Sequence, residues 1–342
     1  MGNDNVEISN LRTLVVGCTP LARKVVHLLD EISDLVGVVN LSPSKGATKS
    51  NYDCMSEFVK ENSYRVHWTE DINSLKTRKW ITEKKPDILV QCGWSQIFKK
   101  KLLDIPKKYC IGIHPSPLPE GRGAAIINWK IIESNNSNVP WGNSLFIMEE
   151  RTDTGDVLDF EPFVIETRDN VRTAYLKVDE TALTMLERTI PKIASNQEKM
   201  TKQDNSLATR YYKRTPKDGK IDLNWPVEKI TDFVRALTHP YPGAFLETKY
   251  GKIAIWQLSP LHPHNYKTAV GEVLWINKWR GVTIAAGQDI ERTVGKRNNE
   301  KTVIMRKAVQ ILRISDASGN EMWADDWAKK VGIKAGDILI NE

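Results

Sequence analysis

The chain has 342 residues, a length that favours two domains over one core. Its 49 Lys and Arg residues against 43 Asp and Glu give a formal net charge of +6, which suits an anionic small molecule and is too diffuse to require nucleic acid. No apolar run reaches the length of a membrane span, and the polar N-terminus is not typical of a signal peptide, so we expect a cytoplasmic protein without membrane contact.

The four cysteines are scattered along the sequence at positions 18, 54, 92 and 110. Three of them sit beside apolar runs, and no pair has the spacing of zinc ligands. This pattern favours buried thiols in a reducing compartment over a disulfide framework, and we expect no metal.

Short apolar runs alternate with helical patterns in the first part of the chain. The predicted strands cover residues 14–16, 36–41, 65–68, 88–90 and 110–113, and the predicted helices cover 21–32, 54–61, 97–103 and a stretch ending at 85. This order predicts the α/β class, with a Rossmann-like, doubly wound, mainly parallel sheet. Functional loops should follow the carboxyl ends of the strands, where Gly17, Gly93 and His114 fall.

The pattern of predicted elements changes after a polar linker over 195–208. Before the linker we expect a helix over 124–133, strands over 144–148 and 157–164, and a helix over 171–194. One helix within 221–237 and short strands over 244–248, 252–258, 271–276, 281–285 and 308–314 then predict a small β-barrel or open sheet. We therefore expect a catalytic domain over residues 1–205 and a smaller β-rich, OB-like domain over residues 206–342.

The most informative segment is 113–123, Ile-His-Pro-Ser-Pro-Leu-Pro-Glu-Gly-Arg-Gly, which starts where a predicted strand ends. Its prolines stiffen the loop, its glycines permit close backbone approach, and Arg122 offers a planar fork for an anion or carbonyl. Asp153 follows in an Asp-Thr-Gly-Asp turn, with Asp156 as the rival acid. A histidine and a carboxylate can supply the donor and the base that acyl transfer to an amine needs.

Several blocks, in this order, resemble the folate-dependent formyltransferase family. They are the loop over 90–97 (Val-Gln-Cys-Gly-Trp-Ser-Gln-Ile), the His114 loop, Asp153-Thr154-Gly155, 213–222, 235–245, 271–286 and 322–339. The resemblance covers most of the chain and extends to methionyl-tRNA formyltransferases and, more closely, to enzymes that formylate nucleotide-linked amino sugars.

The resemblance implies that the N-terminal domain binds 10-formyltetrahydrofolate as co-substrate. Carried over by position, His114 is the catalytic histidine that stabilises the tetrahedral oxyanion, and Asp153 is the acid that accepts the ammonium proton. The residues expected to contact the folate are Gly93, Trp94, Ser95, Gln96, Ile97, Arg122, Glu150 and Arg151. The residues expected to contact the acceptor are Ser116, Lys213, Arg214, Arg235 and Tyr241.

One residue departs from the family's usual motif, because Gly112 stands where Asn is expected two positions before the histidine. Glycine has no side-chain amide, so one oxyanion donor is absent, a loss that typically costs about 3 kcal/mol in barrier. Three interpretations remain open: backbone N–H groups or water assist His114 and Asp153, Asn128 or another amide reaches the site, or catalysis is impaired.

Two acceptors fit the resemblance, an aminoacyl-tRNA and a nucleotide-linked amino sugar. The segment 40–51 contains only two basic residues, Lys45 and Lys49. This is little positive charge for a loop that binds tRNA, because affinity for nucleic acid scales with the number of phosphates neutralised. Gly112 and the loop over 93–96 look like the amino-sugar branch. The sequence therefore favours a nucleotide-linked amino sugar over Met-tRNA, in a protein that could form a homodimer.

Three other functions are weaker. A dinucleotide-dependent dehydrogenase is disfavoured because residues 17–20 do not form a G-x-G-x-x-G motif. A formyltetrahydrofolate hydrolase would hardly need a second domain. An RNA-binding module could stack bases on Trp275, Trp279 and Trp323, although these residues fit packing better.

Overall fold

The chain folds into two compact units. The computed structural model describes residues 9–264, 268–294 and 301–340. The first unit comprises Met1–Ile126, Pro140–Val164 and Tyr175–Lys213, and the second comprises Ile127–Val139, Ile165–Ala174 and Arg214–Glu342. The chain thus passes between the units more than once, and its last passage lies between Lys213 and Arg214.

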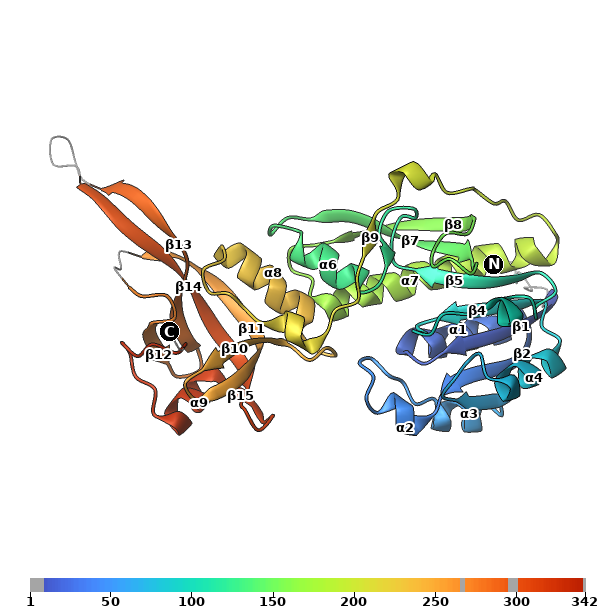
Figure 1. The fold of residues 1–342 in the computed structure, drawn as a ribbon, viewed down its shortest axis with the longest axis horizontal. Coiled ribbons are helices and arrows are strands. Elements are labelled where there is room, and N and C mark those ends of the chain that lie inside the picture. The colour runs from blue at the N-terminus through green and yellow to red at the C-terminus, as the bar shows by residue number, and fades with distance from the viewer. Residues whose placement is uncertain (1–8, 265–267, 295–300, 341–342) are drawn as a thin grey trace, which may run out of the picture. The chain divides into compact units, whose positions relative to one another are not determined.

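A seven-stranded sheet forms the centre of the first unit (Figure 1). Its order is β3-β2-β1-β4-β5-β7-β8, parallel from β3 to β5 and antiparallel between β5 and β7. The strands are β1 (Ser9–Gly17), β2 (Ser33–Leu41), β3 (Val66–Thr69), β4 (Ile88–Cys92), β5 (Tyr109–His114), β7 (Val139–Ile147) and β8 (Val157–Ile165). The predicted Rossmann-like, mainly parallel sheet is confirmed, and its order reverses between β1 and β4, where such sheets bind ligands.

Helices cover both faces of this sheet because successive strand residues point to opposite sides. The helices of this part of the chain are α1 (Pro20–Ile32), α2 (Pro43–Gly46), α3 (Ser56–Glu61), α4 (Leu75–Lys84), α5 (Lys100–Leu103) and α7 (Val171–Ala194). Helix α6 (Ile126–Ile132) belongs, except for its first residue, to the second unit. Val15 and Val38 belong to the core cluster under α1, α3 and α7, whereas Leu14 and Val39 belong to the cluster that holds residues of α4 and α5. The helix predicted over 171–194 has the predicted bounds.

Two expectations for the first unit need correction. The helix predicted over 97–103 begins only at Lys100, because Asn73 binds the carbonyl of Ile97 and the N–H of Lys99 and holds that stretch extended. The segment 195–208 is not a free linker, because Thr201 exchanges two backbone hydrogen bonds of 2.8 Å with Val157 and the segment belongs to the first unit.

The second unit contains an antiparallel sheet of six strands in the order β10-β11-β14-β13-β12, with β15 paired to β14. Its elements are β10 (Ala244–Thr248), β11 (Gly251–His264), β12 (Val273–Asn277), β13 (Gly281–Val294), β14 (Lys301–Ser315), β15 (Glu321–Trp323), α8 (Val227–Leu237) and α9 (Ala324–Val331). The β-rich C-terminal part is confirmed, but β13 and β14 are far longer than predicted and form an extended ribbon (Figure 1). The outer part of this ribbon has charged cross-strand partners such as Asp289 and Arg306, so its sequence lacks the apolar run by which the other strands were predicted.

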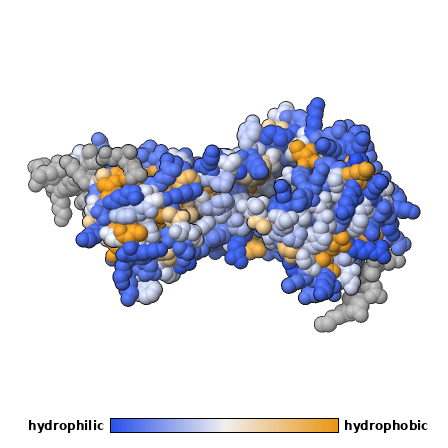
Figure 2. Space-filling view, turned by 60° about the horizontal axis from the view of Figure 1, so that its bottom comes forward, coloured by the Kyte–Doolittle hydropathy of each residue, from blue (hydrophilic) through white to orange (hydrophobic). Residues whose placement is uncertain are grey.

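In the part of the chain that the structure describes, no helix combines the length and apolar character needed to cross a membrane. On the face in Figure 2, hydrophobic residues form separate patches among hydrophilic ones. The four cysteines are free thiols, of which Cys54 alone is exposed.

Candidate active site

His114 ends strand β5, and the loop that follows fixes its ring. Its Nε2 lies 2.8 Å from the carbonyl oxygen of Gly121. Because a carbonyl can only accept, Nε2 must carry the proton and donate it, which leaves Nδ1 as the atom that can react. The loop itself is tied down by Trp141, whose Nε1 donates to the carbonyl of Pro115 at 2.8 Å. The histidine side chain is only 8% exposed.

Asp153 lies opposite the free nitrogen of this ring. Its Oδ1 is 3.8 Å from His114 Nδ1, too long for a hydrogen bond but close enough for charge attraction when both ring nitrogens carry a proton. Its Oδ2 accepts a 2.8 Å hydrogen bond from the backbone N–H of Gly123. Asp153 has a φ of +62°, the left-handed region that aspartate tolerates better than most residues. The structure thus brings together the two predicted catalytic side chains, from the end of β5 and from the loop between β7 and β8.

Arg122 turns away from this pair into a buried polar network. Its guanidinium donates to Gln203 Oε1 and to Asn205 Oδ1 at distances of 2.7–3.1 Å, and burial lowers its pKa. Gln203 in turn donates from Nε2 to the carbonyls of Asp153 and Gly155, at 3.0 and 2.7 Å. The described contacts of Arg122 therefore serve to hold the Asp153 loop. Sequence reasoning missed Gln203, since a glutamine in a polar segment carries no signal.

The Gly121–Gly123 stretch is clamped from the other side by a short parallel ladder. Strand β6 (Arg122–Gly123) pairs with β9 (Arg210–Tyr211), and Gly121 N donates to Thr209 Oγ1 at 2.8 Å. A Cβ at Gly123 would lie 2.1 Å from the carbonyl oxygen of Tyr211, so only glycine permits this approach. Arg210 was also missed, and its guanidinium donates to the carbonyl of Thr152 beside Asp153.

The predicted folate loop after β4 alternates between inward and outward side chains. Gly93, at a φ of +66°, Ser95 and Ile97 are exposed, and the Ile97 side chain is 63% exposed. Trp94 is buried in a core cluster, and the amide of Gln96 is bonded to Ile72 N and to the carbonyl of Glu70. Gly93, Ser95 and Ile97 are therefore the residues of this loop that can meet a ligand.

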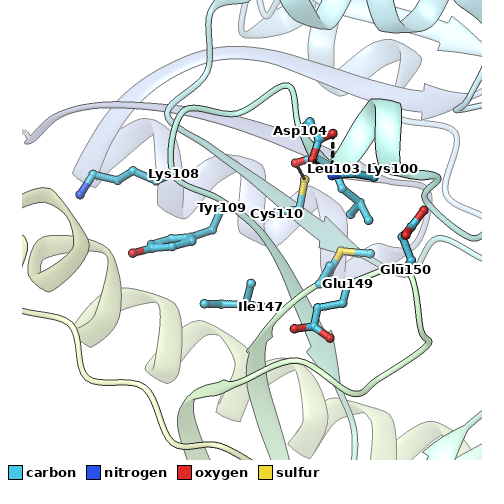
Figure 3. A pocket seen from close by; sticks show the side chains of 10 residues that line it. Lys100, Leu103, Asp104, Lys108, Tyr109, Cys110, Ile147, Glu149 and Glu150 are labelled. Carbon is cyan, nitrogen blue, oxygen red and sulfur yellow. Dashed lines mark hydrogen bonds and ion pairs between the residues drawn. The ribbon is translucent and has the colours of Figure 1, made fainter.

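Two neighbouring cavities border the start of the Asp153 loop. One of about 250 Å³ lies beside β5 and β7, and Figure 3 shows Lys100 joined to Asp104 near Glu150. The other, of about 530 Å³, is lined by Ile97, Lys99 and Glu150 among others. Their lining residues do not include His114 or Asp153. Of the two further residues expected to hold the folate, Glu150 thus borders both cavities, whereas Arg151 is exposed and lines neither.

Two residues expected at the acceptor lie largely inside the chain, with Ser116 buried and the Arg235 side chain 11% exposed. Ser116 is fully buried, its carbonyl accepts a 2.7 Å bond from Ser144 Oγ, and its hydroxyl has no partner among the described residues. Arg235 is committed within the second unit, where its guanidinium contacts Asp232 at 2.8 Å, Ser134 Oγ at 2.7 Å and the carbonyl of Asp169. Arg235 thus links helix α8 to the segments that contain Ser134 and Asp169.

The other three acceptor candidates are spread over both units. Arg214 stacks over the ring of Trp129 with 4.5 Å between guanidinium carbon and ring centroid, and burial lowers its pKa. Tyr241 is half-buried in the second unit. Lys213 is exposed at the end of the first unit. Exposure makes Lys213 the most accessible of the three.

The place of the absent asparagine is filled by an aromatic ring. Gly112 pairs with Phe146 across β5 and β7, and a Cβ at Gly112 would lie 2.6 Å from Phe146 Cε1. The Phe146 ring meets His114 edge-on, with centroids 6.4 Å apart. Asn128, the alternative amide, donates instead to the carbonyl of Ala236 at 2.7 Å. Phe146 therefore supplies packing where a polar side chain was expected, and the Asn128 amide donates to a carbonyl within the second unit.

We expect Gly112→Asn to destabilise the chain by about 1–3 kcal/mol, because the new side chain overpacks the strand pair against Phe146. Thermal unfolding measures this cost. In a Phe146→Ala background, Gly112→Asn should cost less than it does in the wild-type chain, since the ring is the obstacle. An unchanged melting temperature in Gly112→Asn would show that the ring moves aside freely.

Comparison with known proteins adds two family matches. A model described as formyl transferase matches residues 33–190, and one described as formyl transferase, C-terminal domain, matches residues 213–332. The bifunctional polymyxin resistance protein ArnA of Wigglesworthia glossinidia brevipalpis is 30% identical over 253 residues, or 72% of this chain and 38% of that protein. Methionyl-tRNA formyltransferase of Bacillus licheniformis is 28% identical over 313 residues, which are 90% of this chain and 91% of that protein.

Solved structures share the fold at low identity. HypX from Aquifex aeolicus in complex with tetrahydrofolic acid has a TM-score of 0.62 at 16% identity, covering 98% of this chain and 51% of its own. A sugar N-formyltransferase from a Shewanella species has a TM-score of 0.57 at 18% identity, covering 72% of this chain and 97% of its own. The chain thus spans about half the length of HypX and 38% of that of ArnA.

Proposed function

The chain belongs to the formyl transferase family, and we propose that it transfers the formyl group of 10-formyltetrahydrofolate to the primary amine of a nucleotide-linked amino sugar. The observation that carries the proposal is the facing of His114 Nδ1 and Asp153 Oδ1 across 3.8 Å in a buried setting. A base and a donor held this way meet the two needs of acyl transfer to an amine.

The folate fits the outward residues of the loop after β4. The exposed Ile97 offers apolar contact, Gly93 and Ser95 leave backbone accessible, and a cavity of about 530 Å³ continues from Ile97 to Glu150. Trp94 and Gln96 turn inward and support this loop, and Arg122 holds the Asp153 loop through Gln203. When bound, 10-formyltetrahydrofolate supplies the formyl carbon that the acceptor amine attacks.

The roles of the two side chains follow from their hydrogen bonds. Asp153, held by the N–H of Gly123, accepts the proton that the amine loses as its bond to the formyl carbon forms. That proton balances the one gained by the folate nitrogen when its bond to the formyl carbon breaks. His114 can donate to the formyl oxygen only through Nδ1, because Nε2–H is used by Gly121, so the ring acts when protonated on both nitrogens.

An amino-sugar acceptor is supported by the segment after β2. It folds into the short helix α2, and Lys49, one of its two lysines, turns inward, with Nζ 3.1 Å from Cys18 Sγ and 3.3 Å from the carbonyl of Gly93. A half-buried lysine bonded within the chain is less available to neutralise RNA phosphates. The fold shared with the Shewanella sugar N-formyltransferase agrees with this choice.

Met-tRNA is the second candidate acceptor. It is favoured by the methionyl-tRNA formyltransferase of Bacillus licheniformis, whose similarity extends over 90% of this chain, including the β-rich part. The two candidates differ in charge, because a tRNA presents many phosphates and a nucleotide sugar presents two.

The test is a panel assay with 10-formyltetrahydrofolate and either nucleotide-linked amino sugars or Met-tRNA. We expect formylated product with at least one amino sugar, detected by mass spectrometry as a gain of one formyl group. Sugars that carry a hydroxyl in place of the amine serve as controls and should give none. Turnover on Met-tRNA alone would replace the acceptor and keep the activity, whereas no turnover on any amine would reject both.

A further inference from the structure

We propose that the groove beside Ile97 binds an oligo-γ-glutamate tail on the folate co-substrate, an inference that rests on the proposed folate-dependent activity. The groove encloses about 530 Å³ and lies entirely within the first unit. Each γ-linked glutamate adds one carboxylate to the far end of a folate, so a longer tail is a more strongly anionic ligand. The proposed occupant is therefore a flexible polycarboxylate.

The charge of the groove matches such a ligand. Arg78, Lys99, Lys100 and Lys101 line it against a single carboxylate, Glu150. Lys100 is neutralised by Asp104, whose two oxygens lie 2.8 and 2.9 Å from its Nζ. Within the described part of the chain, Arg78, Lys99 and Lys101 form no ion pair with a carboxylate. Three cations thus face a groove that contains one opposing charge.

Asn73 fixes the backbone at Lys99 and the guanidinium of Arg78. Its Nδ2 donates to the carbonyl of Ile97 and its Oδ1 accepts from Lys99 N, both at 2.9 Å, while its own carbonyl accepts from Arg78 Nε at 3.1 Å. One residue therefore anchors the turn before α5 and the arginine of α4. Backbone anchoring of this kind lowers the ordering cost of binding.

The groove shares one residue with the loop that carries Asp153. Glu150 lines the groove and stands three residues before Asp153 in the same loop. Ile97, 63% exposed, lines the groove from the loop after β4. A folate whose formyl end reaches Asp153 and whose aromatic middle covers Ile97 would direct its tail toward Lys99 and Lys101.

The test compares the affinity of the full chain for 5-formyltetrahydrofolate with one and with five glutamates, by isothermal titration calorimetry. An exposed ion pair changes an equilibrium by about 1.5- to 5-fold, so several pairs should make the pentaglutamate bind about ten-fold more tightly. This advantage should shrink between about 0.05 and 0.5 M salt, because screening weakens exposed charges.

Variants separate the groove from a general charge effect. Lys99→Glu with Lys101→Glu should abolish the pentaglutamate advantage, measured as the ratio of the two folate affinities in the same variant. The milder Lys99→Gln with Lys101→Gln should reduce that ratio. Lys192→Glu with Lys199→Glu makes the same charge change at exposed residues outside the groove and should keep the advantage.

The outcomes distinguish the proposed tail groove from the proposed folate-dependent activity. Equal affinity for the two folates in the wild-type chain overturns the tail groove, while monoglutamate binding leaves the folate-dependent activity standing. Folded groove variants that keep the full advantage also overturn it. Failure of both folates to bind removes the two proposals together.

Discussion

Replacing His114 with glutamine should lower kcat for formyl transfer by about 10²- to 10⁴-fold. Glutamine can still donate to the carbonyl of Gly121, the bond that His114 Nε2 makes at 2.8 Å, so the loop after β5 stays in place. The substitution removes Nδ1, the only ring atom free to act on the formyl oxygen. The effect is measured as kcat on the acceptor that the panel assay identifies.

Two further measurements show whether the loss is chemical. The affinity of His114→Gln for 5-formyltetrahydrofolate and its melting temperature should stay close to those of the wild-type chain. A kcat within a few-fold of wild type would remove His114 from the mechanism, whereas lost folate affinity would instead assign it to binding.

Asp153→Asn should lower kcat by about 10²- to 10⁴-fold as well, because the amide cannot accept the amine's proton. Asparagine can keep the 2.8 Å bond from Gly123 N, so the loop and the fold should survive. The expected signature is a large fall in kcat with little change in melting temperature.

Asp156→Asn is the matched control, since Asp156 is the rival acid of the same turn. The backbone carbonyl of Asp156 accepts from Ile147 N at 2.9 Å, a bond that survives the substitution. We expect kcat within about two-fold of wild type. If Asp156→Asn were the inactive variant and Asp153→Asn the active one, the two acids would exchange roles.

Local signals explain which elements could be predicted. The apolar runs of β1, β2, β4 and β5 and the long periodic helix α7 were predicted because burial on one or both faces leaves a regular pattern in the sequence. The length of strands β13 and β14 was underestimated because charged residues interrupt the apolar pattern in the outer part of the ribbon. Helix α9 and the two-residue strands β6 and β9 were missed, since short elements depend on partners from elsewhere in the chain.

The candidate site divides in the same way. The prolines and glycines around His114 and the turn at Asp153 could be predicted to form loops, because turn preferences depend on residues adjacent in the sequence. Gln203 and Arg210 were not, because each acts on the Asp153 loop from about fifty residues further along the chain. Arg122 and Arg235 looked like ligand contacts, yet both guanidinium groups are bonded within the chain.

The family resemblance, the α/β order and the choice of His114 and Asp153 can be predicted from the sequence, because each resides in a contiguous motif. The free nitrogen of His114, the ring that fills the space beside Gly112 and the cations that face a groove beside Ile97 become known only from the folded chain. Those features depend on distances between residues far apart in the chain, and only folding sets such distances.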